Sequence, residues 1–102
     1  MREKLEAMLA SGQDSAALRF ALANAYFRDA LHERAIEHAR FAVTHDPDYS
    51  AAWRLLGQAQ VAAGLTSDAA ASFERGIAVA KKSGDRQVEK EMQVFLRRLQ
   101  SS

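Results

Sequence analysis

Apolar residues recur every three or four positions along this chain, the spacing that places side chains on one face of an α-helix. Leu18, Leu22 and Tyr26 show it in one segment, and Val88, Met92 and Phe95 show it near the carboxyl end. In the second of these segments the other face is charged, with Glu89, Lys90, Glu91, Arg97 and Arg98. No segment has the pattern of a strand, so the sequence predicts an all-α protein.

Glycine and proline divide this pattern into six predicted helices. Proline disfavours helical backbone in the residue before it, so Asp46-Pro47-Asp48 separates the third helix from the fourth. Gly84 suits the left-handed conformation that ends many helices and separates the fifth from the sixth. The first two helices are predicted at residues 2–11 and about 15–30. The third is predicted to end near residue 45, the fourth near 64 and the fifth near 82, and the sixth to run from about 85 to 99.

The chain also repeats itself with a shift of 34 residues. A period of about 34 residues is the length of one helix–turn–helix unit in a helical solenoid. The repeat therefore predicts stacked helix pairs. The matching positions are Leu22 and Leu56, Leu31 and Leu65, Ala35 and Ala69, and the small residues Ala23 and Gly57, and Ala42 and Gly76.

This unit resembles the tetratricopeptide repeat family. The family pattern is Trp-x2-Leu-Gly-x2-Tyr in the first helix, then Ala-x3-Phe, a small residue and a proline. The second unit supplies Trp53, Leu56, Gly57, Ala69, Phe73 and Gly76, and departs from the pattern at Gln60 and Lys81. The first unit supplies Leu22, Tyr26, Ala35, Ala42 and Pro47, has Ala23 in the glycine position, and departs at Arg19 and Ala39.

The resemblance implies a right-handed helical-repeat solenoid of antiparallel helix pairs, in a single domain over residues 1–102. Residues 16–49 and 50–83 are expected to form two full repeats. Residues 2–11 resemble the second helix of a preceding partial repeat, and residues 85–99 look like a capping helix. A strict repeat frame would bury Lys90 and Glu91 there, so we expect a slip of one residue that buries Val88, Met92 and Phe95.

In this family the first helix of each pair lines a concave groove, which commonly holds an extended peptide or a partner helix. Amide side chains there can pair with a peptide backbone, and arginines can bind carboxylates. In the alternative interpretation the aromatic residues pack between helices and the polar residues only face solvent. The resemblance places Phe20, Asn24, Phe27, Arg28, Arg54, Gln58 and Val61 along the groove.

The resemblance thus implies a non-catalytic protein–protein interaction module: an adaptor, scaffold or assembly factor that binds another protein or peptide. The alternative is a self-associating subunit of a homo-oligomer or larger complex, in which a second copy covers Phe20 and Phe27. Some family members grip chaperone tails with a five-residue carboxylate clamp. This chain matches that clamp only at Asn24, so we do not expect that activity.

Composition excludes several other classes. Hydrophobic residues make up 48% and charged residues 26% of the chain, an ordinary globular balance. The net charge of +1 gives no overall attraction to nucleic acid or to a membrane surface. The amino terminus lacks the apolar run of a secretory signal, and no apolar stretch approaches the ~20 residues that cross a bilayer. We therefore expect a cytoplasmic protein.

Candidate chemistry is sparse. His38 and His45 are seven residues apart and His32 lies in a turn, whereas metal sites typically use closer ligands completed by cysteine or carboxylate. We interpret all three histidines as solvent-facing. The chain has no cysteine, and it shows no glycine-rich phosphate loop or nucleophile elbow. We expect no enzyme activity, no cofactor and no metal.

Overall fold

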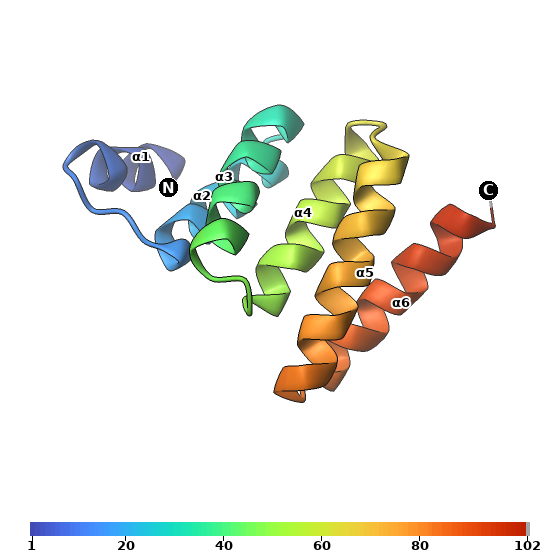
Figure 1. Ribbon diagram of the computed structural model, residues 1–102. Coiled ribbons are helices and arrows are strands. Elements are labelled where there is room, and N and C mark those ends of the chain that lie inside the picture. Colours follow the sequence, from blue (N-terminus) through green and yellow to red (C-terminus); the bar gives the residue numbers. More distant parts are fainter. Residues whose placement is uncertain (102) are drawn as a thin grey trace.

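The apolar stripes fold as six α-helices, without a strand, in residues 1–101, the part of the chain that the computed structural model describes (Figure 1). The all-α prediction is confirmed. Ser102, the last residue of the predicted domain, lies outside the described residues. The helices are α1 (Arg2–Ala10), α2 (Ala16–Arg28), α3 (His32–His45), α4 (Ser50–Ala62), α5 (Thr66–Ser83) and α6 (Arg86–Gln100).

Local sequence sets where these helices begin and end. The Ser15 hydroxyl caps α2 by accepting a hydrogen bond from the Leu18 amide at 3.0 Å. Gly84 ends α5 in the left-handed conformation, with φ at 78°. The α2–α3 and α4–α5 turns share one geometry, in which the amide of the residue after the turn bonds back to the last helical turn. Gly64 takes the left-handed position in the second of these turns, and Ala30 takes it in the first.

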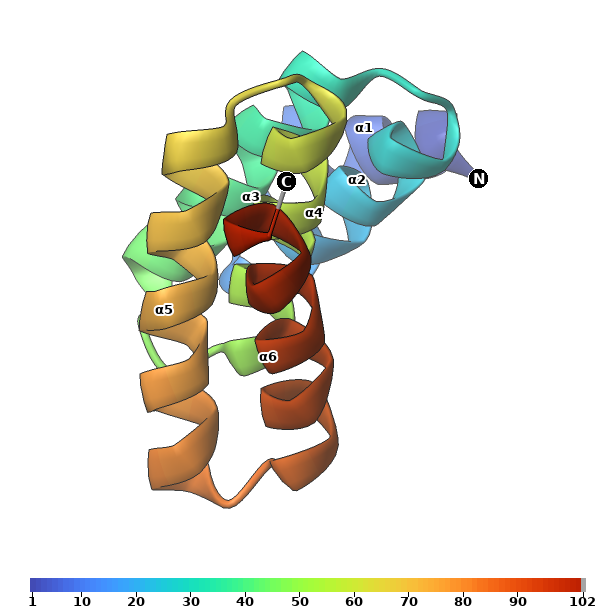
Figure 2. The ribbon, with the colours of Figure 1, turned by 90° about the vertical axis from the view of Figure 1, so that its right-hand side faces the viewer.

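The helices stack in two layers. α2 packs on α3 and α4 packs on α5, and α4 also contacts both α2 and α6. Figure 2 shows α3 and α5 on one side of the molecule and α2, α4 and α6 on the other. Among the helices in residues 1–101, α1 contacts only α2.

Buried side chains form two clusters that meet at Trp53. Leu22, Ala39 and Leu56 belong to the larger cluster, which joins α2, α3 and α4. Phe73 and Met92 belong to the smaller cluster, which joins α5 and α6. Trp53 packs against both clusters. The burial of Val88 and Met92 confirms the expected slip of the last helix, although Phe95 stays half-buried.

Small residues bring neighbouring helices close together, as the repeat pattern indicates. A Cβ atom added at Gly57 would collide with the ring of Phe73. A Cβ atom added at Gly76 would lie 2.7 Å from the Cβ of Trp53 and would also collide with the Met92 sulfur. Both glycines are buried inside helices. Their lack of a side chain is what lets α5 approach α4 and α6 so closely.

Two departures from the family pattern are accommodated by polar contacts. Gln60 is only 2% exposed, and its side-chain oxygen accepts a hydrogen bond from the Ser72 hydroxyl at 2.6 Å. Arg19, which replaces the family tryptophan, donates to both carboxylate oxygens of Asp14 at 2.9 and 3.0 Å. Its guanidinium carbon also lies 3.8 Å from the ring centre of Phe41. The buried Gln60 amide and the half-buried Arg19 guanidinium therefore both have hydrogen-bond partners.

The interpretation of all three histidines as solvent-facing is wrong for His38, which is 5% exposed. Its ring stacks on Tyr26 with centres 5.3 Å apart, and its Nδ1 lies 3.2 Å from a guanidinium nitrogen of Arg19. Arginine only donates, so Nδ1 accepts and the ring is neutral. Burial, and then the nearby Arg19 charge, lower the pKa of His38. His45 is exposed, whereas His32 is half-buried.

Candidate functional site

The seven predicted groove residues stand on α2 and α4, and none of them is fully buried. Arg28 and Val61 are exposed, and the other five are half-buried. We use the term "α2–α4–α6 face" for the side of these three helices opposite α3 and α5 (Figure 2).

Two of these residues help to form a cleft between α4 and α6. Gln58 and Val61 line it from α4, one helical turn apart. The cavity has a volume of about 230 Å³. Its remaining lining comes from Phe73 of α5 and from three residues of α6, which are Phe95, Arg98 and Leu99. We call it the α4–α6 cleft.

A salt bridge spans the two helices beside the cleft. The Arg54 guanidinium pairs with the Glu91 carboxylate. Arg54 lies one turn before Gln58 on α4, and Glu91 lies one turn before Phe95 on α6. The pair therefore ties α6 to α4 just before the cleft, and it gives Arg54 a structural role that the sequence did not predict.

The predicted residues on α2 do not all join this site. The ring of Phe20 packs on Tyr49 with centres 5.0 Å apart, and the ring of Phe27 lies 5.9 Å from His32. Arg28 borders a separate hollow of about 330 Å³ near the amino end of α1. The structure thus brings Arg54, Gln58 and Val61 together beside α6, and it separates Arg28 from them.

The α6 residues of the cleft were missed by sequence reasoning. Phe95 and Leu99 are four residues apart on the apolar stripe of α6, where the sequence predicted Phe95 to be buried. In the structure both remain half-buried. The available signal was the departure of residues 85–99 from the strict repeat frame, which marks this helix as packing differently from the helices before it.

The charged residues of α2, of α4 and of residues 92–100 in α6 are all positive. α2 and α4 contain no aspartate or glutamate, and neither do residues 92–100 of α6. Acidic residues stand instead on α1, α3, α5, the first half of α6 and the turns. The positive side chains of the acid-free segments are Arg19, Arg28, Arg54, Arg97 and Arg98.

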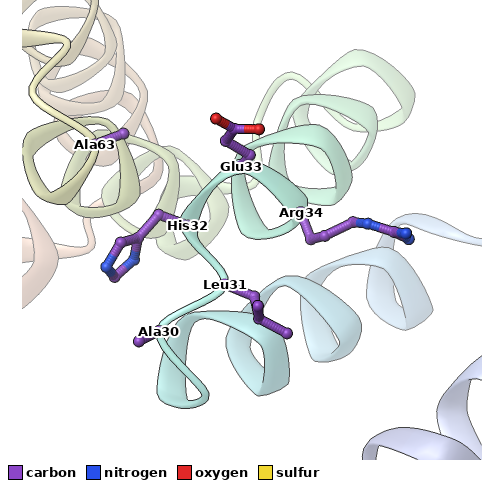
Figure 3. A pocket seen from close by; sticks show the side chains of 6 residues that line it. All are labelled: Ala30, Leu31, His32, Glu33, Arg34 and Ala63. Atoms are coloured by element: carbon purple, nitrogen blue, oxygen red, sulfur yellow. The ribbon is translucent and has the colours of Figure 1, made fainter.

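A second hollow lies at the α2–α3 turn and has a volume of about 410 Å³. Figure 3 shows its lining residues, which include Ala63, the residue just after α4, together with residues 30–34 of the α2–α3 turn and the start of α3. The side chains of His32, Glu33 and Arg34 point in different directions there, so they do not converge on a common ligand position. This arrangement provides no set of groups for acid–base or nucleophilic chemistry.

Residues 1–101 contain no group of three or more histidine, cysteine, aspartate or glutamate side chains placed to hold a metal ion. Within the same residues, no helix combines the length and the apolar character required to cross a membrane.

Comparisons with known proteins agree with this architecture. Residues 16–59 match the tetratricopeptide repeat family. A TPR repeat-containing protein of Pseudomonas aeruginosa is 52% identical over 99 residues, covering 97% of this chain and 94% of the relative.

Solved structures give the same result. A Bordetella parapertussis protein solved in solution has a TM-score of 0.86 at 44% identity, covering 99% of this chain and 88% of that one. The crystal structure of a tetratricopeptide repeat domain protein from Salinibacter ruber has a TM-score of 0.80 at 26% identity, covering 86% and 98%. Because a named relative is this similar over nearly its whole length, the chain belongs to the tetratricopeptide repeat family.

Proposed function

We propose that this protein is a non-catalytic interaction module that holds an extended peptide or partner segment along its α2–α4–α6 face. Tetratricopeptide repeats are generally protein–protein interaction modules. The observation that carries the proposal is the α4–α6 cleft, where Gln58 and Val61 border an opening of about 230 Å³. In this proposal residues 16–49 and 50–83 are the two repeats that build the face.

The chemistry of the face supports an extended chain as its occupant. Asn24 and Gln58 each carry a donor and an acceptor, which can pair with the backbone of a peptide. They occupy equivalent positions in the two repeats, 34 residues apart. Phe20, Phe27 and Val61 add partly exposed apolar surface beside them. Alternating polar and apolar contacts are typical of peptide recognition.

Selection from a random peptide library tests the proposal. Peptides of about 12 residues are suitable, because their extended length matches the 42 Å long axis of the molecule. The dissociation constant of the best selected peptide is then measured by fluorescence anisotropy. Asn24→Ala and Gln58→Ala should each weaken binding about 3- to 10-fold, the usual effect of losing one hydrogen bond.

Thr44→Ala on α3 is the matched control, because Thr44 is exposed and its hydroxyl donates to the Arg40 carbonyl of the same helix. It should bind the selected peptide like the unmodified protein. If Asn24→Ala and Gln58→Ala also bind it with unchanged affinity, the peptide does not use this face and the proposal is wrong.

Self-association is the second candidate, and the exposed Val94 on α6 favours it, with 36% of its surface open to solvent. A second copy would then cover the face instead of a peptide. Light scattering over a dilution series separates the two functions. A monomer that binds the selected peptide supports the interaction module. A dimer that persists on dilution and excludes the peptide supports self-assembly.

A further inference from the structure

The α4–α6 cleft exists because α6 leaves the stack at an angle. Near its start α6 is held tightly, since Met92 packs against Gly76 and Glu91 pairs with Arg54. Beyond these contacts the ribbon of α6 diverges from α4 and α5 toward its carboxyl end (Figure 1). The apolar stripe of α6 continues into the diverging half, so Phe95 and Leu99 pack against the second cluster and also border an opening.

Aromatic and aliphatic groups dominate the lining of this cleft. Phe73 is fully buried, and its ring lies 5.5 Å from the ring of Phe95, tilted by 34°. Val61 and Leu99 add aliphatic surface, and Gln58 and Arg98 supply the polar groups. A cavity of about 150 Å³ lined by apolar side chains is large enough to bind benzene. The 230 Å³ of this cleft therefore accommodates a leucine or an aromatic side chain.

The charges around the cleft favour a negatively charged partner. Arg98 lines the cleft itself, Arg97 is its neighbour, and Arg54 lies one turn from Gln58. Across α4 and α6, Glu91 pairs with Arg54, and Asp85 at the start of α6 accepts a hydrogen bond from the Ser50 hydroxyl of α4. Because α2, α4 and residues 92–100 contain no acidic residue, the end of this face that borders the cleft attracts anions and repels cations.

We infer that the α4–α6 cleft binds the bulky apolar side chain of an acidic peptide segment. This inference rests on the proposed function and specifies its partner: an extended chain with excess aspartate or glutamate and one leucine, phenylalanine or tryptophan as its anchor. The apolar side chain fills the cleft, and flanking carboxylates pair with the surrounding arginines. Buried apolar area supplies affinity, and charge supplies selectivity and a faster association rate.

The peptides selected above provide the test. We expect these peptides to be rich in acidic residues and to share one bulky apolar residue. Replacing this residue by alanine should weaken binding about tenfold or more. Raising the salt concentration from about 0.1 to about 0.5 M should weaken binding further, because it screens the carboxylate–arginine attraction.

A charge placed at the rim of the cleft tests the location. Val61→Glu should weaken binding of the selected peptide about tenfold, since a carboxylate there repels an acidic chain and hydrates the cleft. Leu31→Glu is the matched control, because Leu31 and Val61 are both 43% exposed and the change in charge is the same. Leu31 lies at the α2–α3 turn, so the Leu31→Glu variant should bind the selected peptide like the unmodified protein.

Failure of this inference can be distinguished from failure of the proposed function. Selected peptides that depend on Asn24 but lack acidic residues, or that tolerate Val61→Glu as well as Leu31→Glu, overturn the inference and leave the module intact. A selection that yields no peptide overturns both. Tighter binding of an oligothymidylate of equal charge than of any selected peptide assigns the arginines to nucleic acid and also overturns the inference.

Discussion

A proton on His38 would disrupt the packing around it. Its Nδ1 accepts from Arg19, and its ring stacks on Tyr26, whose hydroxyl donates to Glu6. The guanidinium carbon of Arg34 also lies 5.9 Å from the centre of the Tyr26 ring. A protonated imidazole could no longer accept from Arg19 and would add a positive charge beside two arginines. The neutral form is therefore the folded form.

The first prediction is that His38 makes the protein less stable at mildly acidic pH. Burial lowers the pKa of His38 in the folded state, whereas in the unfolded chain it is about 6.5. Below pH ~6.5 the unfolded state binds a proton that the folded state rejects. The free energy of unfolding therefore decreases as the pH is lowered, by at most about 1.4 kcal/mol per pH unit. Urea denaturation between about pH 7.5 and 5.5 measures the slope.

His38→Gln should remove this part of the slope, because glutamine keeps an acceptor for Arg19 but does not titrate. His45→Gln changes an exposed histidine of the same helix and should keep it. Equal slopes in the two variants would contradict the role of His38.

The second prediction concerns Ala30, the one non-glycine residue with positive φ in residues 1–101, at 60°. The equivalent residue of the second repeat is Gly64, with φ at 79°. The left-handed conformation costs alanine about 1 kcal/mol relative to glycine. Ala30→Gly should therefore raise the free energy of unfolding by about 1 kcal/mol, measured by urea denaturation.

Ala63→Gly provides the comparison, since Ala63 lies one position before Gly64 with an ordinary φ of −86°. It relieves no strain and gives the unfolded chain more freedom, so it should lower stability. A fall in stability for Ala30→Gly as well would show that the turn carries no strain.

At the scale of elements, matching helices of the two repeats are packed with different residues. The second repeat opposes Gly57 to Phe73, and the first has Ala23 and Ala39 at the equivalent positions. All four residues are buried. Gly57 thus leaves room for one large ring, whereas the first repeat has a buried alanine at each of these positions.

The third prediction follows from this difference. Gly57→Ala should lower the free energy of unfolding by about 1–2 kcal/mol, because the collision with the Phe73 ring outweighs the gain in helix propensity. Phe73→Leu should relieve the collision, so adding Gly57→Ala in that background should cost much less. A double-mutant cycle from urea denaturation measures the coupling. Additive effects would mean that Phe73 is not the obstacle.

The helices were largely predictable from sequence because the residues that begin and end them act locally. Gly84 ends α5 where it was expected, and the 34-residue repeat identified both helix pairs. The burial of His38 was not predictable, since it depends on Arg19 replacing the family tryptophan and bonding to the ring. The Arg54–Glu91 pair and the α4–α6 cleft depend on the angle of α6, which no residue spacing encodes.

At the scale of the whole molecule, the stack measures 42 × 28 × 18 Å, and its helices contact mainly their neighbours in sequence. Cooperative unfolding of such a stack depends on the interfaces between adjacent units. Trp53 occupies that interface, since it packs against both buried clusters and its indole nitrogen donates to the Pro47 carbonyl at 2.8 Å. Together with the Gly57–Phe73 packing and the Arg54–Glu91 pair, it couples α5 and α6 to the rest of the described chain.

The fourth prediction is that Trp53→Ala destabilises the protein and also divides it. The free energy of unfolding should fall by about 3 kcal/mol, at the lower end for a tryptophan because Trp53 is partly exposed. Native-state hydrogen exchange should show that α5 and α6 lose more protection than α2 and α3, since the second cluster loses its link to the first. Trp53→Phe, which keeps most of the apolar contact, should preserve a single transition. An equal loss of protection in every helix after Trp53→Ala would show that the two clusters unfold together without depending on this side chain.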